Sequence, residues 1–394
     1  MPTIDRAALA DRLVGILSDL IAIPSAFPPG DTREICAYAA DFLRRHGYEP
    51  RILTRTGTLD NCVARIGPGK GAGGPSIVFN AHADTVAIGE REMWRTDPLR
   101  AVIADGAVHG LGAGNCKGSM AVHLWLAEEI ARRGGVARGE AVFTFVADEE
   151  NLGPDGTYFL RETGEVRPDM LVLGAQTENQ LITAERGVLW VRLEATGRAA
   201  HAGNPAAGDN AIMRMMRLLD RLDLELGSRL SVRRDGEMPS TMNVGLIRGG
   251  HNTNVVPNRC MVEIDRRVLP DETVEAAFAE LRELMETAGE PPGTVKVEFL
   301  RGTNGFSAPK NGELVSAFER TVLAHRNAPV RFLNATGVSD GRYFAGDGIE
   351  IVKFGPGSGT QGHAANESVP IDQMVDAALI QLGVLERLLG LADS

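Results

Sequence analysis

Residues 76–84 read SIVFNAHAD, a short apolar run that ends in a histidine and an aspartate two positions apart. The continuous apolar stretch over residues 76–79 is typical of a strand that is buried on both faces of a parallel sheet. In such sheets, ligands bind at the carboxyl ends of the strands. The polar end of this strand is therefore the first candidate for a functional site, with His82 and Asp84 as its side chains.

Two further strand-like runs also end in polar residues. The run at 141–147 leads into three consecutive acids, and the run at 349–354 leads through Gly-Pro-Gly to His363. Adjacent Glu149 and Glu150 suit a division of labour in which one ligates a metal ion and the other accepts a proton from water. Taken alone, such a pair is also compatible with a solvated strand end.

The two polar residues at the end of the first strand also suggest a specific role. His82 and Asp84 suit a metal-binding imidazole whose second ring nitrogen is oriented by a nearby carboxylate. A lone His-x-Asp pair also occurs as a surface or packing feature, so it does not identify a metal site by itself. The hypothesis gains weight only when the three strand ends are considered together.

The chain is too long for a single hydrophobic core, so two domains are expected for its 394 residues. Strand-like and helix-like runs alternate at both ends of the chain, which predicts an α/β domain with a mostly parallel central sheet flanked by helices. We assign residues 1–182 and 302–394 to this discontinuous domain. Residues 183–301 change to alternating strands and two helices, which predicts a smaller inserted α+β domain. The predicted helices cover residues 5–22, 32–46, 118–133, 157–163, 210–226, 272–289, 311–327 and 371–389.

The composition argues against several classes of partner. The formal net charge is −11 without any basic cluster, whereas nucleic-acid binding needs concentrated Lys and Arg. The apolar runs are too short to cross a membrane, and residues 1–20 read as an amphipathic helix rather than an export signal. Four scattered cysteines indicate reduced thiols. We expect a cytoplasmic protein that acts on a small molecule. Residues 67–74 are Gly-rich and are expected to form a hairpin loop.

Taken in order, these motifs resemble the M20-type family of metal-dependent hydrolases. This family includes acetylornithine deacetylase, succinyl-diaminopimelate desuccinylase, aminoacylase and carboxypeptidase G, and the resemblance runs nearly end to end. It implies a zinc-peptidase-like catalytic domain with an inserted ferredoxin-like dimerisation domain, and hence a homodimer or higher homo-oligomer. The matching motifs lie at residues 80–86, 94–98, 110–118, 147–153, 197–203, 254–267, 336–340, 355–357 and 363–367.

The resemblance implies a role for each residue at the strand ends. In this family, two divalent ions are bridged by one carboxylate and one water molecule. By the resemblance, His82 would bind one ion and would be oriented by Asp84. Glu150 and His363 would bind the other ion. Glu149 would be the general base.

The resemblance also implies roles for three residues of the inserted domain. His201 would polarise the substrate carbonyl in the cleft of the partner subunit, and Asn254 and Arg267 would help to bind a substrate carboxylate. An arginine suits this role because its guanidinium can pair with both carboxylate oxygens. From the residues alone, Arg267 could instead pair with an acid such as Glu263, and His201 could lie in an ordinary exposed turn.

Two positions depart from the family pattern. The bridging carboxylate is replaced by Asn115, whose neutral amide offers one oxygen and cannot bridge two cations. A second acidic ligand position holds Ala175. We therefore predict at most one tightly held divalent ion per subunit, Zn²⁺ or Mn²⁺, with low affinity and with Asn115 as a weak ligand. Glu178 or Asp148 could supply a replacement carboxylate.

The sequence thus predicts a hydrolase that cleaves an amide or related C–N bond in a small substrate bearing a carboxylate. Two alternatives remain open. The first is a hydrolytic deaminase of an aromatic amine, because the family includes nitroanthranilate aminohydrolase. The second is a relative that has lost catalysis and only binds its ligand, since Asn115 and Ala175 alter the expected metal ligands.

Overall fold

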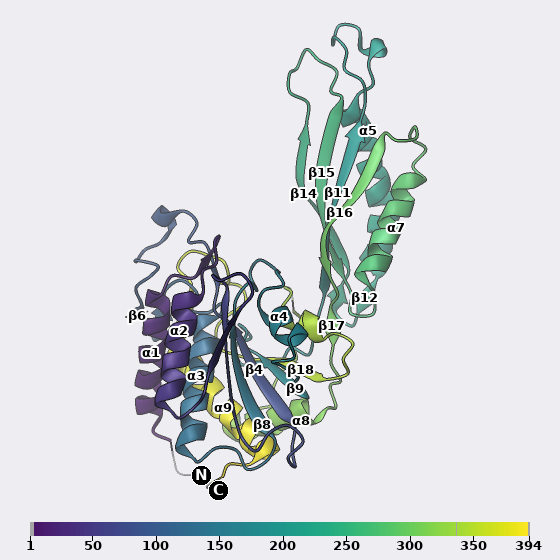
Figure 1. Ribbon diagram of the computed structural model, residues 1–394. Coiled ribbons are helices and arrows are strands. Elements are labelled where there is room, and N and C mark those ends of the chain that lie inside the picture. Colours follow the sequence, from purple (N-terminus) through teal and green to yellow (C-terminus); the bar gives the residue numbers. More distant parts are fainter. Residues whose placement is uncertain (1–3, 336, 393–394) are drawn as a thin grey trace. The chain divides into compact units, whose positions relative to one another are not determined.

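The computed structural model describes residues 4–335 and 337–392; residues 1–3 and 393–394, and residue 336, which begins one of the sequence motifs, lie outside the described part. The chain forms two compact units (Figure 1). The first comprises Met1–Thr183, Ala308–Leu333 and Ser339–Ser394, and the second comprises Ala184–Ser307 and Asn334–Val338. No helix in the described part of the chain is long and apolar enough to span a membrane.

A six-stranded sheet forms the centre of the first unit. Four neighbouring strands are parallel to one another, and the two remaining strand pairings at the end of the sheet are antiparallel. Three of the four parallel strands overlap the strand-like runs expected at residues 76–79, 141–147 and 349–354. In spatial order the strands are β18 (Glu350–Lys353), β9 (Met170–Leu173), β4 (Ser76–His82), β8 (Glu140–Val146), β3 (Asp60–Ile66) and β2 (Arg51–Thr54).

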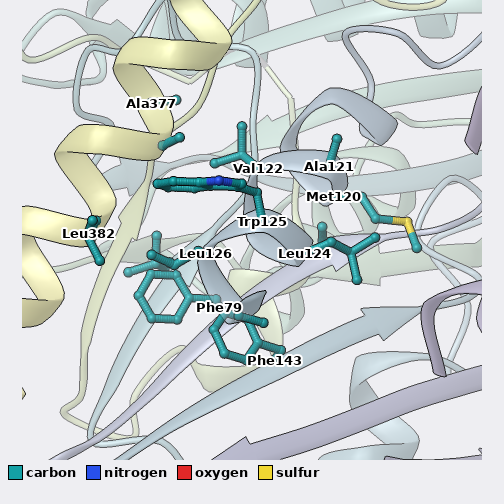
Figure 2. Close-up of a cluster of buried hydrophobic side chains, with 14 of the residues drawn as sticks. Phe79, Met120, Ala121, Val122, Leu124, Trp125, Leu126, Phe143, Ala377 and Leu382 are labelled. Carbon is teal, nitrogen blue, oxygen red and sulfur yellow. The ribbon is translucent and has the colours of Figure 1, made fainter. Parts of the chain in front are cut away.

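Helices cover this sheet and enclose the main core. Helices α2, α3 and α8 pack on the sheet, and α1 and α9 pack on α3. Phe79 of β4 and Phe143 of β8 stack with ring centroids 5.5 Å apart, and Figure 2 shows them together with apolar residues of α3 and α9. Burying each such side chain contributes roughly 1.5–3 kcal/mol. The helices are α1 (Arg6–Ala22), α2 (Arg33–Arg45), α3 (Lys117–Arg132), α4 (Thr157–Glu162), α8 (Glu313–Arg326) and α9 (Ile371–Leu389).

The Gly-rich segment at residues 67–74 does not form the predicted hairpin loop. It connects β3 to β4, and these strands are not neighbours, because β8 lies between them. Strand β8 pairs antiparallel with β3 and parallel with β4. A Gly-rich composition indicates a turn but does not reveal which strands the turn brings together.

The second unit is a four-stranded antiparallel sheet with two main helices on one face (Figure 1). The chain order β-α-β-β-α-β and the strand order β14-β15-β11-β16 are those of a ferredoxin-like fold. Along β11, buried residues alternate with more exposed residues, as expected for a sheet covered on one face. The elements are β11 (Gly187–Thr196), α5 (Ala211–Arg221), β14 (Thr241–Gly249), β15 (Arg259–Val268), α7 (Val274–Glu286) and β16 (Val295–Thr303).

The sequence and the structure divide the chain at slightly different places. The predicted boundary after residue 301 falls inside β16, which continues to Thr303 and pairs there with Val188 of β11. The short strand β17 (Phe306–Ser307) then pairs with β10 (Ala184–Glu185), so the main segment of the second unit ends at Ser307. The predicted helix at 210–226 is α5 followed by a π-helical turn, Leu222–Gly227.

Candidate metal centre and active site

The site lies where the central parallel strands end. His82 is the last residue of β4 and is in register with Val146, the last residue of β8. The turn that follows β8 contains Glu149 and Glu150, and so it lies next to the end of β4. This register explains why acids some 67 residues after His82 in the chain are its neighbours in space.

Asp84 orients the acidic turn more directly than it orients the imidazole. His82 Nδ1 donates a hydrogen bond to the backbone carbonyl of Asp84 at 2.9 Å, whereas the Asp84 carboxylate is 3.6 Å away. That carboxylate accepts hydrogen bonds from the backbone amides of Glu149 and Glu150, at 3.4 and 3.1 Å. The expected orientation of His82 is therefore supplied mainly by the carbonyl of Asp84, because its side chain is engaged by the turn.

Four potential ligand side chains converge beyond this point. Ligand atoms of His82, Glu149 and Glu150 all lie within 4.8 Å of one another. His82 Nε2 is 3.8 Å from a Glu149 oxygen. His363 Nε2 is 3.0 Å from a Glu150 oxygen, and this hydrogen bond raises the pKa of His363. The structure thus brings together the side chains of all three strand ends.

Asn115 lies among these four side chains. Its Nδ2 donates to Glu150 Oε1 at 2.6 Å and is 3.2 Å from His363 Nε2, while its Oδ1 is 3.3 Å from His82 Nε2. The peptide bond between Asn115 and Cys116 is cis. The neutral amide therefore contacts residues on both sides of the position where the family resemblance implies a bridging carboxylate.

Glu367 also belongs to the surroundings of Asn115, and the sequence analysis assigned it no role. Its carboxylate is buried and accepts hydrogen bonds from the backbone amides of Gly112, Gly114 and Asn115, and from the side chain of Gln176. Burial raises its pKa. The only signal in the sequence was its place in the motif at 363–367, four residues after His363. Glu367 thereby fixes the backbone of the segment that carries Asn115.

Asp340 and Arg342 are two further residues for which the sequence predicted no role. Arg342 Nη2 is 3.5 Å from the Asp340 carboxylate, and both side chains are buried. Asp340 also accepts a hydrogen bond from Thr157 at 2.7 Å. Burial raises the pKa of Glu149 to about 8; His82 opposes this shift, whereas Glu150 and Asp340 add to it. A carboxylate with a raised pKa is better suited to accept a proton than an exposed one.

The imidazole and carboxylate groups gathered here are of the kinds that ligate a divalent ion, but the second acidic ligand position implied by the resemblance holds no ligand atom. Ala175, after the end of β9, offers no ligand atom, and the neighbouring Gln176 is engaged by Glu367. Asp148 accepts hydrogen bonds from Asp155 and Asn151. Within residues 4–335 and 337–392, neither Asp148 nor Glu178 joins the cluster of metal-ligating side chains. A replacement carboxylate from either residue, which the sequence left open, is thus not seen.

The three predicted residues of the inserted domain all lie in the second unit. His201 and Asn254 occupy adjacent loops, where the Ala202 amide donates to the Asn254 carbonyl at 2.9 Å. His201 Nδ1 accepts a hydrogen bond from the Gly203 amide at 3.0 Å. The proton of a neutral ring is therefore on Nε2, which makes Nε2 a donor.

Arg267 pairs with Asp265 and not with Glu263. Its Nε and Nη2 donate to the two Asp265 oxygens at 2.8 and 3.1 Å. Glu263 is directly opposite Arg192 in the sheet and pairs with that residue instead. Asp265 and Arg267 are two residues apart in β15, so their side chains share one face of the sheet. The alternative of an internal ion pair was thus correct in kind, but with a different acid.

Comparisons with known proteins agree with this fold. Residues 183–292 match the family model of a peptidase dimerisation domain. The succinyl-diaminopimelate desuccinylase of Bordetella parapertussis is 28% identical over 397 residues, which cover 98% of this chain and 100% of the relative. The desuccinylase of Marinobacter nauticus is 28% identical over 345 residues, covering 85% of this chain and 88% of the relative.

Solved structures show the same architecture. An M20 family metallo-carboxypeptidase from Sulfolobus solfataricus superposes with a TM-score of 0.79 at 16% identity, over 96% of this chain and 99% of the other. A dinuclear metal-binding peptidase of the M20 family from Bacillus subtilis has a TM-score of 0.72 at 15% identity, over 98% and 99% of the two chains.

The fold and the kinds of side chain that converge at the strand ends resemble those of one class of protein, the metal-dependent, metallopeptidase-like hydrolases. Within this class, the chain resembles the M20 type over nearly its whole length, and residues 183–292, almost all of them in the second unit, match the model of a peptidase dimerisation domain. The fold class that the sequence predicts is confirmed.

Proposed function

We propose that this protein hydrolyses an amide or related C–N bond in a small substrate that bears a carboxylate. The observation that carries the proposal is the convergence of His82, Glu149, Glu150 and His363 at the ends of the parallel strands. Such a set of imidazole and carboxylate groups suits Zn²⁺ or Mn²⁺. The relatives named as desuccinylases support an amide substrate, since their name describes removal of a succinyl group.

Glu150 and His363 would hold a single ion, because a Glu150 oxygen lies 3.0 Å from His363 Nε2 and the two residues come from separate segments. When bound, a divalent ion supplies Lewis acidity for a carbonyl oxygen and for water. Glu149 would accept a proton from the attacking water and return it to the leaving nitrogen. Asp84 holds the backbone of both glutamates and keeps the base beside the ligand.

The second unit would complete the site by binding the substrate. His201 would donate from Nε2 to the developing oxyanion, in keeping with the tautomer that Gly203 fixes. Asn254 and Arg267 would bind the substrate carboxylate, with Arg267 exchanging or sharing its present partner, Asp265. The dimerisation domain supports an arrangement in which His201 acts in the partner subunit of a homodimer. All four cysteines are buried and unpaired, which supports a cytoplasmic location.

The substitution Glu149→Gln tests the proposal. Loss of the proton acceptor is expected to lower kcat by about 10²–10⁴-fold while the amount of bound ion stays the same. Activity is measured as amine release from N-succinyl and N-acyl amino acids, and metal content by elemental analysis of dialysed protein. The exposed variant Glu319→Ala serves as the control and is expected to keep full activity.

Three results would contradict the proposal. Equal activity of Glu149→Gln and the control would remove Glu149 from the chemistry. Activity in neither protein, with ligand binding retained, would support a binding protein without catalysis. Ammonia release from aromatic amines, without cleavage of N-acyl amino acids, would support the deaminase alternative.

A further inference from the structure

The amide of Asn115 and a cation would need the same ligand atoms. Its Nδ2 hydrogen is directed at Glu150 Oε1 at 2.6 Å, and the same nitrogen is 3.2 Å from His363 Nε2. An N–H group repels a cation, and an oxygen that accepts a short hydrogen bond has less electron density to offer to a metal. In this orientation, Asn115 is a competitor for the ion and not a ligand.

The backbone of Asn115 cannot easily move away from this place. Its amide donates to Glu367 at 2.6 Å, and the same buried carboxylate accepts the amides of Gly112 and Gly114. The neighbouring Gln176 donates to Glu367 as well and lies so close to Gly114 that a Cβ there would be 2.6 Å from its Nε2. The segment is therefore held from two sides.

Rotation of the side-chain amide remains available. The terminal torsion of an asparagine is broad and roughly two-fold, so a half turn exchanges Oδ1 and Nδ2 with little change in shape. After such a turn, Oδ1 would face Glu150 and His363, and Nδ2 would face His82 Nε2. His82 Nδ1 donates to the Asp84 carbonyl, which leaves Nε2 of a neutral ring as the acceptor that Nδ2 needs.

We propose that Asn115 is an internal competitor that sets the ion affinity of this site, and that its amide turns over when an ion binds between Glu150 and His363. This inference rests on the ligand assignment of the proposed function. An aspartate in this place would bring a third carboxylate to Glu149 and Glu150 and would depend on cations to offset the repulsion. The neutral asparagine needs no cation, because it hydrogen-bonds to the same surroundings, but it lowers the ion affinity of the site.

Two variants test the competition. Asn115→Ala removes the donor, and the expected result is an Mn²⁺ dissociation constant lower by roughly tenfold, the order expected for a hydrogen bond to a charged group. The melting temperature in chelator is expected to fall, because Glu150 loses the hydrogen bond that Asn115 Nδ2 donates to it. Asn115→Asp keeps the size of the side chain; it is expected to bind Mn²⁺ more tightly and to melt lower in chelator than with Mn²⁺. Asn311→Ala, at an exposed asparagine before α8, is the matched control.

Calorimetric titration with Mn²⁺ and thermal melts give the answer without an activity assay. Weaker Mn²⁺ binding by Asn115→Ala would show that the amide is a ligand and would overturn the competition. An affinity equal to that of the control would overturn it as well. Failure of the proposed function is distinguished by Glu150→Gln: if this variant binds Mn²⁺ as the unaltered protein does, the ligand assignment itself is wrong.

Discussion

Individual residues in this site have more than one structural role, and both their side chains and their backbone groups form the hydrogen bonds involved. Asp84 illustrates this, because its carbonyl orients His82 while its carboxylate holds the amides of Glu149 and Glu150. The orientation of His82, which we expected from the Asp84 side chain, therefore comes from its carbonyl, and the side chain holds the acidic turn instead. Glu367 is comparable, since a single buried carboxylate fixes the backbone that presents Asn115.

Removing the Glu367 side chain is expected to destabilise the protein. Glu367→Ala leaves the amides of Gly112, Gly114 and Asn115 without their acceptor, and an unsatisfied buried donor costs roughly 1–3 kcal/mol. We therefore expect a loss of roughly 3 kcal/mol or more in the free energy of unfolding, measured by urea denaturation. Glu319→Ala, which truncates an exposed glutamate, is expected to change it by less than about 0.5 kcal/mol. A loss of that small size in Glu367→Ala would mean that the 112–115 segment is held by other contacts.

At the scale of elements, α3 connects the site to the core. It begins at Lys117, directly after the Asn115 segment, and the Lys117 ammonium donates to the Ile23 carbonyl at 2.8 Å. Most of the helix is buried, and it packs against both the sheet and α9. It also carries His123 into the core, where its ring meets Phe79 edge-on at 5.6 Å. A polar ring in this place makes the helix sensitive to acid.

Burial lowers the pKa of His123 from 6.5 to about 3. Well above pH 6.5, His123 is neutral in both the folded and the unfolded chain, and its titration does not change the free energy of unfolding. Below pH 6.5 only the unfolded chain takes up the proton, so the free energy of unfolding decreases as the pH falls towards the folded pKa. We expect the free energy of unfolding to lose about 2 kcal/mol from this residue between pH 7 and pH 5. His123→Leu removes the titrating group, so its stability should fall less with acid over that range. Parallel pH curves for the two proteins would contradict the burial of an uncharged His123.

At the scale of the whole molecule, the candidate ligands and the candidate substrate-binding residues are divided between two units. His82, Asn115, Glu149, Glu150 and His363 belong to the first unit, whereas His201, Asn254 and Arg267 belong to the second. Ion binding should therefore need only the first unit. Catalysis should need both units and, by our proposal, a second subunit.

Charged substitutions in the second unit test whether catalysis needs a second subunit while ion binding does not. Met213 and Met216 are exposed on α5, and large apolar side chains of this kind are enriched at interfaces. The double variant Met213→Glu and Met216→Glu is expected to sediment as a monomer and to lose most activity while keeping its bound ion. Leu323→Glu, at an exposed leucine of α8 in the first unit, is the control. A fully active monomer would contradict the role proposed for His201 in the partner subunit.

Much of the architecture followed from local patterns. The buried strands at 76–82 and 140–146 and the predicted helices lie within a few residues of their expected positions, because apolar periodicity reports burial directly. The pairing of β3 with β8, which excludes a hairpin at residues 67–74, was not predictable in this way. Strand order depends on contacts between segments that are distant in the chain.

The order of residues alone shows which residue types stand at the strand ends, and it shows that Asn115 and Ala175 replace acids that the family resemblance leads one to expect. Which atoms these residues contact can be learned only from the folded chain. In the structure, the Asp84 carboxylate accepts the Glu150 amide of the acidic turn, and Glu367 accepts the backbone amide of Asn115. The Asn115 side chain donates to Glu150. The physical reason is that a hydrogen bond requires atoms to meet within about 3 Å and at a restricted angle. No local pattern fixes such a distance between residues 35 or 252 positions apart in the chain.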